Sequence, residues 1–93
     1  MNRLLLTTRR TIPLDRLDDY LAEWRRVRAA AEAAGGRAWL FRGTGRQDHV
    51  IEFLEWDEAS VPPLPDHEDV ANARLELDQT FGTGVADKWE ETF

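Results

Sequence analysis

This chain of 93 residues contains no cysteine. It therefore has no disulfide, no thiolate nucleophile and no cysteine-ligated zinc or iron–sulfur site. No apolar run approaches the roughly 18 residues that a membrane-spanning helix needs, and the leucines near the start are too few for a signal-peptide core. We therefore expect one domain over residues 1–93, located in the cytoplasm and without a membrane partner.

Lysine is also scarce, and arginine supplies nearly all of the positive charge. Residues 1–47 carry ten arginines and five acids, whereas residues 48–93 carry two basic residues and thirteen acids. A basic half is one way to bind nucleic acid, but these arginines are spread over several elements and no aromatic ladder interleaves with them. We interpret the asymmetry as neutralisation within the fold or across a dimer, with no nucleic-acid partner.

The hydrophobic pattern predicts six elements in the order β-α-β-β-α-β. Strands are expected at residues 3–11, 37–42, 49–56 and 85–93, where β-branched, leucine and aromatic residues concentrate. Helices are expected from Leu14 to the stop at Gly35-Gly36, and from Asp66 or His67 to Phe81. Their apolar stripes are Leu14, Leu17, Tyr20, Leu21, Trp24, Val27 and Ala31 on the first helix, and Val70, Ala73, Leu77 and Phe81 on the second.

This order is typical of the ferredoxin-like α+β fold, an antiparallel four-stranded sheet with two helices on one face. Right-handed crossovers place the first and third strands in the centre. Opposite charges then face one another on neighbouring strands, with Arg3, Arg9 and Arg10 opposite Glu52, Glu55, Glu90 and Glu91. The strands are apolar on both faces, so the face without helices also needs a cover. We therefore predict a homodimer packed sheet to sheet.

These features resemble the dimeric α/β-barrel superfamily, especially its antibiotic biosynthesis monooxygenase-like group. The similarity spans nearly the whole chain and includes the helix that ends at Gly35-Gly36 and the Glu55-Trp56-Asp57-Glu58 that closes the third strand. The resemblance implies a homodimer with one of several activities, among them cofactor-free quinone-forming monooxygenases, haem-degrading oxygenases, lactone isomerases and polyketide cyclases. Haem degradation needs a histidine ligand on the second helix, where Arg74 is the nearest match, so we expect no cofactor.

The two histidines are the candidate catalytic residues. His49 and His67 are the side chains that ordinarily titrate near neutrality, which suits a general acid or base. The plainer interpretations are an exposed polar residue at a strand end for His49 and a helix-start residue for His67. Because the two have no metal-ligand spacing, no metal site is predicted.

The high content of tryptophan indicates an apolar pocket or a well-filled core. Tyr20 and Trp24 lie one helical turn apart and bring an O–H and an N–H into apolar surroundings, and Arg28 follows one turn later. With Trp39 and Asn72 they are the predicted wall of a pocket for a flat aromatic ligand. Alternatively, the aromatic residues fill the core and the dimer interface while Arg28 extends to solvent.

Two functions follow from these observations. The first is a cofactor-independent monooxygenase or related enzyme acting on a small aromatic or polyketide-like molecule. In that reaction a histidine takes a proton, and Tyr20, Trp24 or Asn72 stabilises the oxyanion. The alternative is a non-catalytic small-molecule-binding or assembly module of the same fold. The sequence does not select the substrate.

Overall fold

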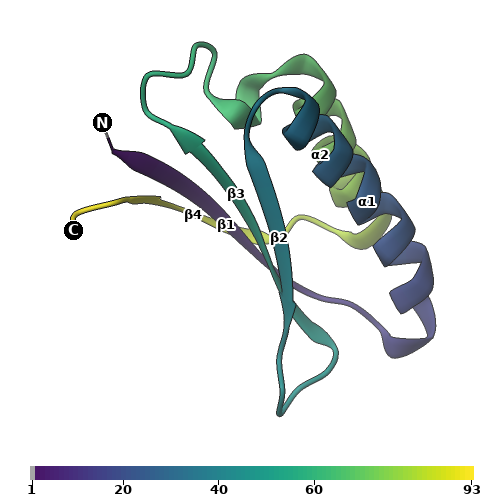
Figure 1. Cartoon of the computed structure of the whole chain (residues 1–93). Coiled ribbons are helices and arrows are strands. Elements are labelled where there is room, and N and C mark those ends of the chain that lie inside the picture. Colours follow the sequence, from purple (N-terminus) through teal and green to yellow (C-terminus); the bar gives the residue numbers. More distant parts are fainter. Residues whose placement is uncertain (1) are drawn as a thin grey trace.

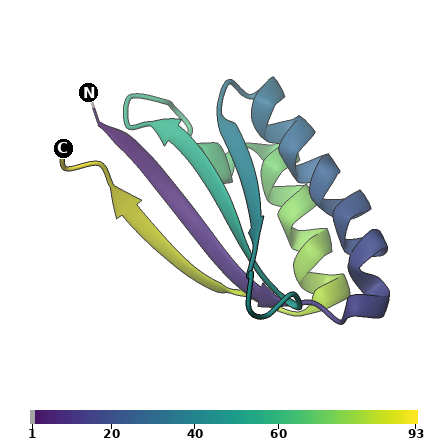
Figure 2. The ribbon, with the colours of Figure 1, turned by 60° about the horizontal axis from the view of Figure 1, so that its bottom comes forward.

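The computed structural model describes residues 2–93 and has the predicted order of elements. They are β1 (Arg3–Thr11), α1 (Leu17–Ala33), β2 (Arg37–Arg42), β3 (His49–Asp57), α2 (Glu68–Phe81) and β4 (Val85–Glu90). Figure 1 shows both helices on one face of the sheet, and the turned view in Figure 2 shows the same two layers. The opposite face of the sheet carries no helix.

The sheet has the strand order β2-β3-β1-β4, and every neighbouring pair is antiparallel. Strands β1 and β3 are central, as predicted, and the fold is ferredoxin-like α+β. Because side chains alternate between the faces of a strand, the register assigns each residue to one face. Leu6 and Ala38 pair with Leu54 on the helix-covered face, whereas Thr7 and Trp39 pair with Phe53 on the other. We call the second face the open face.

The largest differences from the predicted element boundaries are at the start of the first helix and the end of the last strand. The first helix begins at Leu17 and not at Leu14, because a 3-10 turn (Leu14–Arg16) comes first. The N–H of Arg16 donates to the carbonyl of Pro13 to close this turn, and the Leu14 side chain is exposed. The last strand ends at Glu90 and not at Phe93. Its neighbour β1 begins at Arg3, so the chain beyond Glu91 has no strand to pair with.

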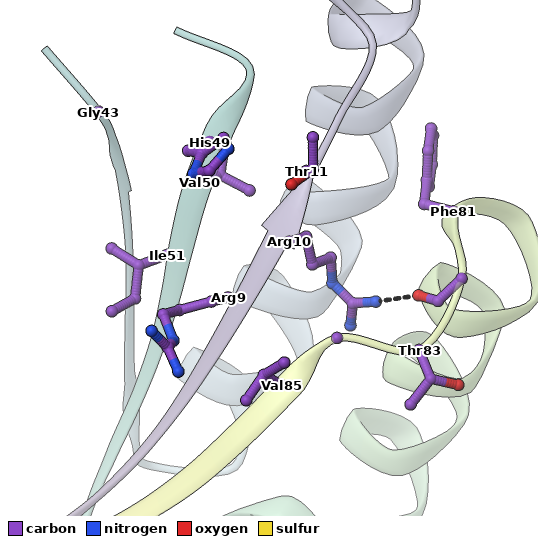
Figure 3. A pocket seen from close by; sticks show the side chains of 12 residues that line it. Arg9, Arg10, Thr11, Gly43, His49, Val50, Ile51, Phe81, Thr83 and Val85 are labelled. Atoms are coloured by element: carbon purple, nitrogen blue, oxygen red, sulfur yellow. Dashed lines mark hydrogen bonds between the residues drawn. The ribbon is translucent and has the colours of Figure 1, made fainter. Parts of the chain in front are cut away.

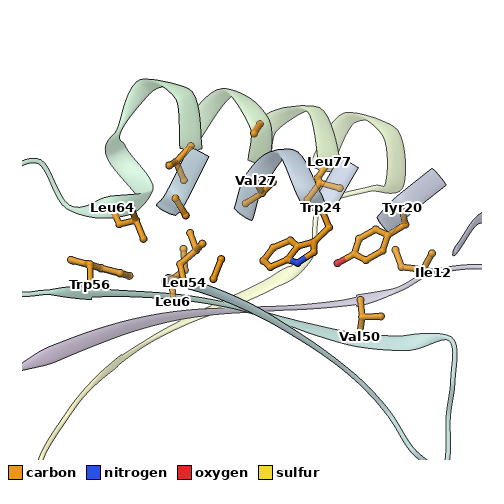
Figure 4. Close-up of a cluster of buried hydrophobic side chains, with 14 residues drawn as sticks. Leu6, Ile12, Tyr20, Trp24, Val27, Val50, Leu54, Trp56, Leu64 and Leu77 are labelled. Carbon is orange, nitrogen blue, oxygen red and sulfur yellow. The ribbon is translucent and has the colours of Figure 1, made fainter. Parts of the chain in front are cut away.

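The hydrophobic core lies between the helices and the covered face of the sheet (Figure 4). Both predicted helical stripes contribute to it, apart from the exposed Leu14. Tyr20 is fully buried and packs edge-to-face against Phe81 at the end of α2, with the ring centroids 5.4 Å apart. The helices and sheet are thus joined by a filled apolar layer.

The open face displays large apolar side chains to solvent. Trp39, Phe41, Val85 and Trp89 are all exposed there. Nε1 of Trp89 donates a hydrogen bond to Oγ1 of Thr7 at 2.9 Å, which holds the indole against the sheet. This is the face that the predicted dimer would bury, and the dimer stays a prediction. Within residues 2–93, no helix is long and apolar enough to cross a membrane.

Candidate functional site

A cluster of charged side chains is buried at one end of the core. Glu52 of β3 accepts hydrogen bonds at a single oxygen, from Nε of Arg10 at 2.7 Å and from the hydroxyl of Tyr20 at 2.5 Å. Nη2 of Arg10 lies 2.8 Å from Oδ1 of Asp78 on α2, and its Nη1 donates to the carbonyl of Gly82 at 2.6 Å. We call Arg10, Tyr20, Glu52 and Asp78 the buried cluster. It links β1, β3 and both helices.

The protonation states of the buried cluster follow from its geometry. Burial raises the pKa of Tyr20, and the neighbouring Glu52 carboxylate raises it further, so the phenol stays neutral and donates its proton. Burial alone would lower the pKa of Arg10, but the carboxylates of Glu52 and Asp78 together outweigh burial, so the pKa lies above its usual value. Burial lowers the pKa of the nearby Arg74, partly offset by Glu52 and Asp78. Arginine remains charged after such a shift.

Beside the buried cluster, a cleft of about 650 Å³ opens at the end of the sheet (Figure 3). We call it the end cleft. Arg10 and Phe81 belong to its inner side, whereas Arg9, His49 and Ile51 belong to the open face of the sheet. Residues 82–84, which connect α2 to β4, form another wall. The end cleft therefore combines apolar walls with a guanidinium and an imidazole.

His49 is held at this cleft by the hairpin between β2 and β3. Its backbone N–H donates to the carbonyl of Arg46, and its carbonyl accepts from the N–H of Gly43. The N–H of Ile12 donates to the carbonyl of Asp48 at 2.7 Å, which ties the start of β3 to the end of β1. The imidazole is half-exposed, and its Nε2 lies 4.0 Å from Oδ1 of Asp48, beyond hydrogen-bond distance. His49 is thus free to contact a ligand.

The second predicted base, His67, lies elsewhere. It caps the start of α2, where it is partly buried. Because α2 starts near the end of β3 and finishes near the end cleft, His67 and His49 lie at opposite ends of the molecule (Figure 1). The two histidines therefore do not share a site within one chain.

The predicted pocket wall is assembled only in part. Trp24, Arg28 and Trp39 line a shallow groove of about 420 Å³ between α1 and the edge strand β2. Tyr20 is instead buried in the core, where its hydroxyl binds Glu52, and Asn72 is exposed on α2. The structure thus brings three of the five predicted residues together in one chain and places Tyr20 and Asn72 elsewhere. Helical spacing identifies an inward face without showing whether that face meets a cavity or packed side chains. Arg28 is exposed and pairs with Glu32 at 2.8 Å.

The sequence did carry a signal for the buried cluster. Arg10 shares the face of Leu6, and Glu52 shares the face of Leu54, so both charged residues fall at inward positions of alternating strands. The cross-strand charge pairs were predicted, and Arg10 does meet Glu52 while Arg3 meets Glu55 and Glu91. The burial of the first pair and its contacts with Tyr20 and Asp78 were missed, because they depend on helix packing.

Metal chemistry has no obvious location in the part of the chain that the structure describes. No group of three or more His, Asp or Glu side chains in residues 2–93 is arranged to hold an ion. The acids of the buried cluster, Glu52 and Asp78, already face the guanidinium of Arg10. The end cleft itself presents the imidazole of His49 and the guanidinium of Arg9.

Solved structures resemble this chain over its whole length. A candidate antibiotic biosynthesis monooxygenase from Bordetella bronchiseptica superposes with a TM-score of 0.76 at 12% identity and full coverage of both chains. SnoaB, a cofactor-independent oxygenase from Streptomyces nogalater, superposes with a TM-score of 0.72 at 13% identity, covering 98% of this chain and 92% of SnoaB. A conserved protein from Methanosarcina mazei superposes with a TM-score of 0.75 at 9% identity, covering 99% of this chain and 95% of the Methanosarcina protein.

These likenesses establish the fold as the ferredoxin-like fold of the antibiotic biosynthesis monooxygenase-like proteins. The resemblance seen in the sequence is confirmed at that level. Comparison with family models and with curated protein sequences gives no match for this chain. Since one fold supports many activities, the function has to be argued from the site.

Proposed function

We propose that the chain is a homodimeric, cofactor-independent oxygenase that acts on a small aromatic or polyketide-like molecule at the end cleft. The observation that carries the proposal is the position of His49, whose half-exposed imidazole lies among apolar walls in the same cleft as Arg9. A neutral imidazole accepts a proton from an activated C–H or O–H group. The guanidinium of Arg9 then stabilises the negative charge that develops on the substrate.

The oxidation draws its electrons from the substrate. Removal of a proton from a CH₂ group between activated rings gives a carbanion and protonated His49. The carbanion reduces O₂ and forms a C–O bond, and the peroxide takes the proton back from His49. Loss of water then leaves a carbonyl, so that R₂CH₂ and O₂ become R₂C=O and H₂O. The apolar side chains of the cleft favour this sequence because they bind flat rings.

The homodimer in this proposal is supported by the open face. Exposed Trp39, Phe41 and Trp89 form an apolar surface of the kind that marks a protein interface. A domain of this size also buries only ~60–65% of its unfolded surface on its own, so a second copy adds stability. Thr11 at the end of β1 and Gly43 just beyond β2 line the end cleft, so the cleft lies at the margin of the open face, where a partner would form a further wall.

The test is oxygen uptake with anthrone, whose CH₂ group lies between two rings and whose oxidation product is a quinone. We expect uptake above the background rate in the presence of a chelator. His49→Gln should lower the rate by at least ~100-fold, the usual contribution of a general base. His67→Gln should leave it unchanged, and loss of activity in that variant alone would move the site to the other end of the molecule. Full activity in both variants removes the proposed base.

The second candidate is the non-catalytic binding or assembly module. It is favoured by the filled interior, in which Tyr20, Trp24 and Trp56 are buried core residues between helices and sheet. On this hypothesis the aromatic residues are structural and the open face is the functional surface. The absence of anthrone oxidation, together with a concentration-dependent dimer, would favour this function over catalysis.

A further inference from the structure

We infer that the end cleft selects a ligand with a carboxylate group on a planar aromatic ring, and that Arg9 binds the carboxylate. The inference rests on the proposed function for the location of the site, but it does not require turnover. Its basis is a comparison of the three arginines that strand β1 carries, at positions 3, 9 and 10. They share a strand but differ in how their charges are neutralised.

Two of these arginines are held by short contacts to carboxylates. Arg3 places one Nη 2.8 Å from Glu55 and the other 2.8 Å from Glu91. Arg10 lies 2.7 Å from Glu52 and 2.8 Å from Asp78 in the buried cluster. Contacts of this length are charge-assisted hydrogen bonds or close ion pairs. Neither guanidinium is available to a ligand without losing them.

Arg9 differs because its ion pair is loose. Its Nη2 lies 4.0 Å from Oδ2 of Asp87, at the outer limit of an ion pair, and its side chain is 64% exposed. A guanidinium presents donors in a planar fork that fits a carboxylate with two parallel hydrogen bonds. Arg9 can therefore bind an anion without giving up a short contact.

The surroundings of Arg9 specify the rest of the ligand. Ile51 and Val85 are its partners on the two neighbouring strands, so the arginine emerges between two apolar side chains of the same face (Figure 3). A flat ring can lie on these side chains while its carboxylate meets the guanidinium. Asp87 lies beside the guanidinium of Arg9, and Asp48 lies beside the imidazole of His49. A monoanion therefore suits the cleft better than a phosphate dianion.

The wall beside Arg9 is fixed before any ligand arrives. Arg10 holds the carbonyl of Gly82 at 2.6 Å, and Gly82 adopts a positive φ of 87°. Gly84 packs so closely on β1 that a Cβ there would lie 2.8 Å from the carbonyl oxygen of Arg9. The turn between α2 and β4 is thus held against β1. A preorganised wall reduces the entropy lost on binding.

The experiment compares 2-naphthoate with its neutral analogue 2-naphthamide by isothermal titration calorimetry on the full chain. The two probes share their ring system and differ in charge. We expect the wild type to bind naphthoate at least ~10-fold more tightly than naphthamide, because a hydrogen bond between two charged groups is stronger than one to a neutral acceptor. Arg9→Gln should abolish this preference, whereas Arg3→Gln, a matched variant on the same strand and face, should keep it.

Three results would overturn the inference: equal affinities for the two probes, an unchanged preference in Arg9→Gln, or no binding of naphthoate up to its solubility limit. Amide shifts on naphthoate addition locate the site independently. Shifts at Ile51 and Val85 support the end cleft, whereas shifts confined to Trp39 and its neighbours place the ligand in the groove of α1 and β2. Arg9-dependent naphthoate binding without anthrone oxidation leaves the inference standing and removes the proposed function. Anthrone oxidation without the naphthoate preference does the reverse.

Discussion

Arg9 and Arg10 are consecutive residues of β1, and alternation along the strand sends them to opposite faces of the sheet. The Arg10 side chain is 2% exposed and makes contacts of 2.6 to 2.8 Å with Glu52, Asp78 and Gly82. The Arg9 side chain is 64% exposed, and its ion contact is 4.0 Å long. On the covered face, charge is committed to joining the elements of one chain. On the open face, Arg9 makes no such short contact, and large apolar side chains are exposed to solvent.

This difference shows how one small sheet can combine rigidity with recognition. Burying the ionisable groups of Arg10, Tyr20 and Glu52 is costly unless each has a partner. The buried cluster provides these partners by drawing its members from β1, β3, α1 and α2. The same contacts fix the turn that forms a wall of the end cleft, through the bond from Arg10 to Gly82. Order on the covered face therefore shapes the end cleft, which opens onto the other face.

Removing the Glu52 carboxylate from the buried cluster should destabilise the packing on the covered face. In Glu52→Leu, Arg10 keeps a buried charge without its closest partner and the Tyr20 hydroxyl loses its acceptor. We expect the free energy of unfolding to fall by ~3–5 kcal/mol, measured by urea denaturation at a fixed protein concentration. The control is Glu32→Gln, which removes the exposed pair with Arg28 and should cost under ~0.5 kcal/mol. Similar losses in the two variants would show that the cluster does not stabilise the fold.

The sequence was informative where the determinants are local. Hydrophobic periodicity identified all six elements, and strand order followed from the handedness of the crossovers, which explains why the pairs of Arg3 and Arg10 were anticipated. The packing of helices against the sheet could not be predicted from the sequence in the same way. The sequence placed Tyr20 on an inward face and indicated that its hydroxyl needs a partner, but Glu52 and not a ligand supplies it.

The candidate site was predicted less well than the fold. Two histidines were weighed equally, although the direction of β3 and the course of α2 separate them to opposite ends of the molecule. Arg9 gave no signal of its own, because its availability depends on the 4.0 Å separation from Asp87 and on short contacts made by its neighbours on β1. Such differences among chemically identical residues arise only from three-dimensional geometry.

A charge placed on the open face should test whether a second copy covers it. Phe41 is 58% exposed and packs edge-to-face with Phe53, so Phe41→Asp should change the stability of a single chain little. In a sheet-to-sheet dimer, however, the new aspartate would bury an unpaired carboxylate against the apolar surface of the partner. We expect the dissociation constant of the dimer to rise about 100-fold, equivalent to ~2.7 kcal/mol, in sedimentation equilibrium.

Leu75 offers a matched control for that experiment. It is 52% exposed, but it lies on α2, away from the open face. Leu75→Asp should leave the dissociation constant unchanged. A wild-type chain that remains monomeric at all concentrations would contradict the sheet-to-sheet dimer, and equal weakening by both variants would move the interface to another surface.

The smallest expected effect concerns the hydroxyl of Tyr20, the only tyrosine in the chain. Burial and then the Glu52 carboxylate raise its pKa in the folded state, whereas an unfolded tyrosine ionises near pH 10. The neutral phenol therefore stabilises the fold fully below about pH 10, and this contribution is lost as the pH rises above that point.

We expect no phenolate absorbance from the native protein at about pH 11, and its appearance only together with unfolding. Tyr20→Phe should lower the free energy of unfolding by ~1–2 kcal/mol at neutral pH. As the pH rises, the variant should lose less stability than the wild type. A phenolate transition near pH 10 with native tryptophan fluorescence would show instead that the hydroxyl is accessible, and the covered face would then be less closed than the contacts of Glu52 indicate.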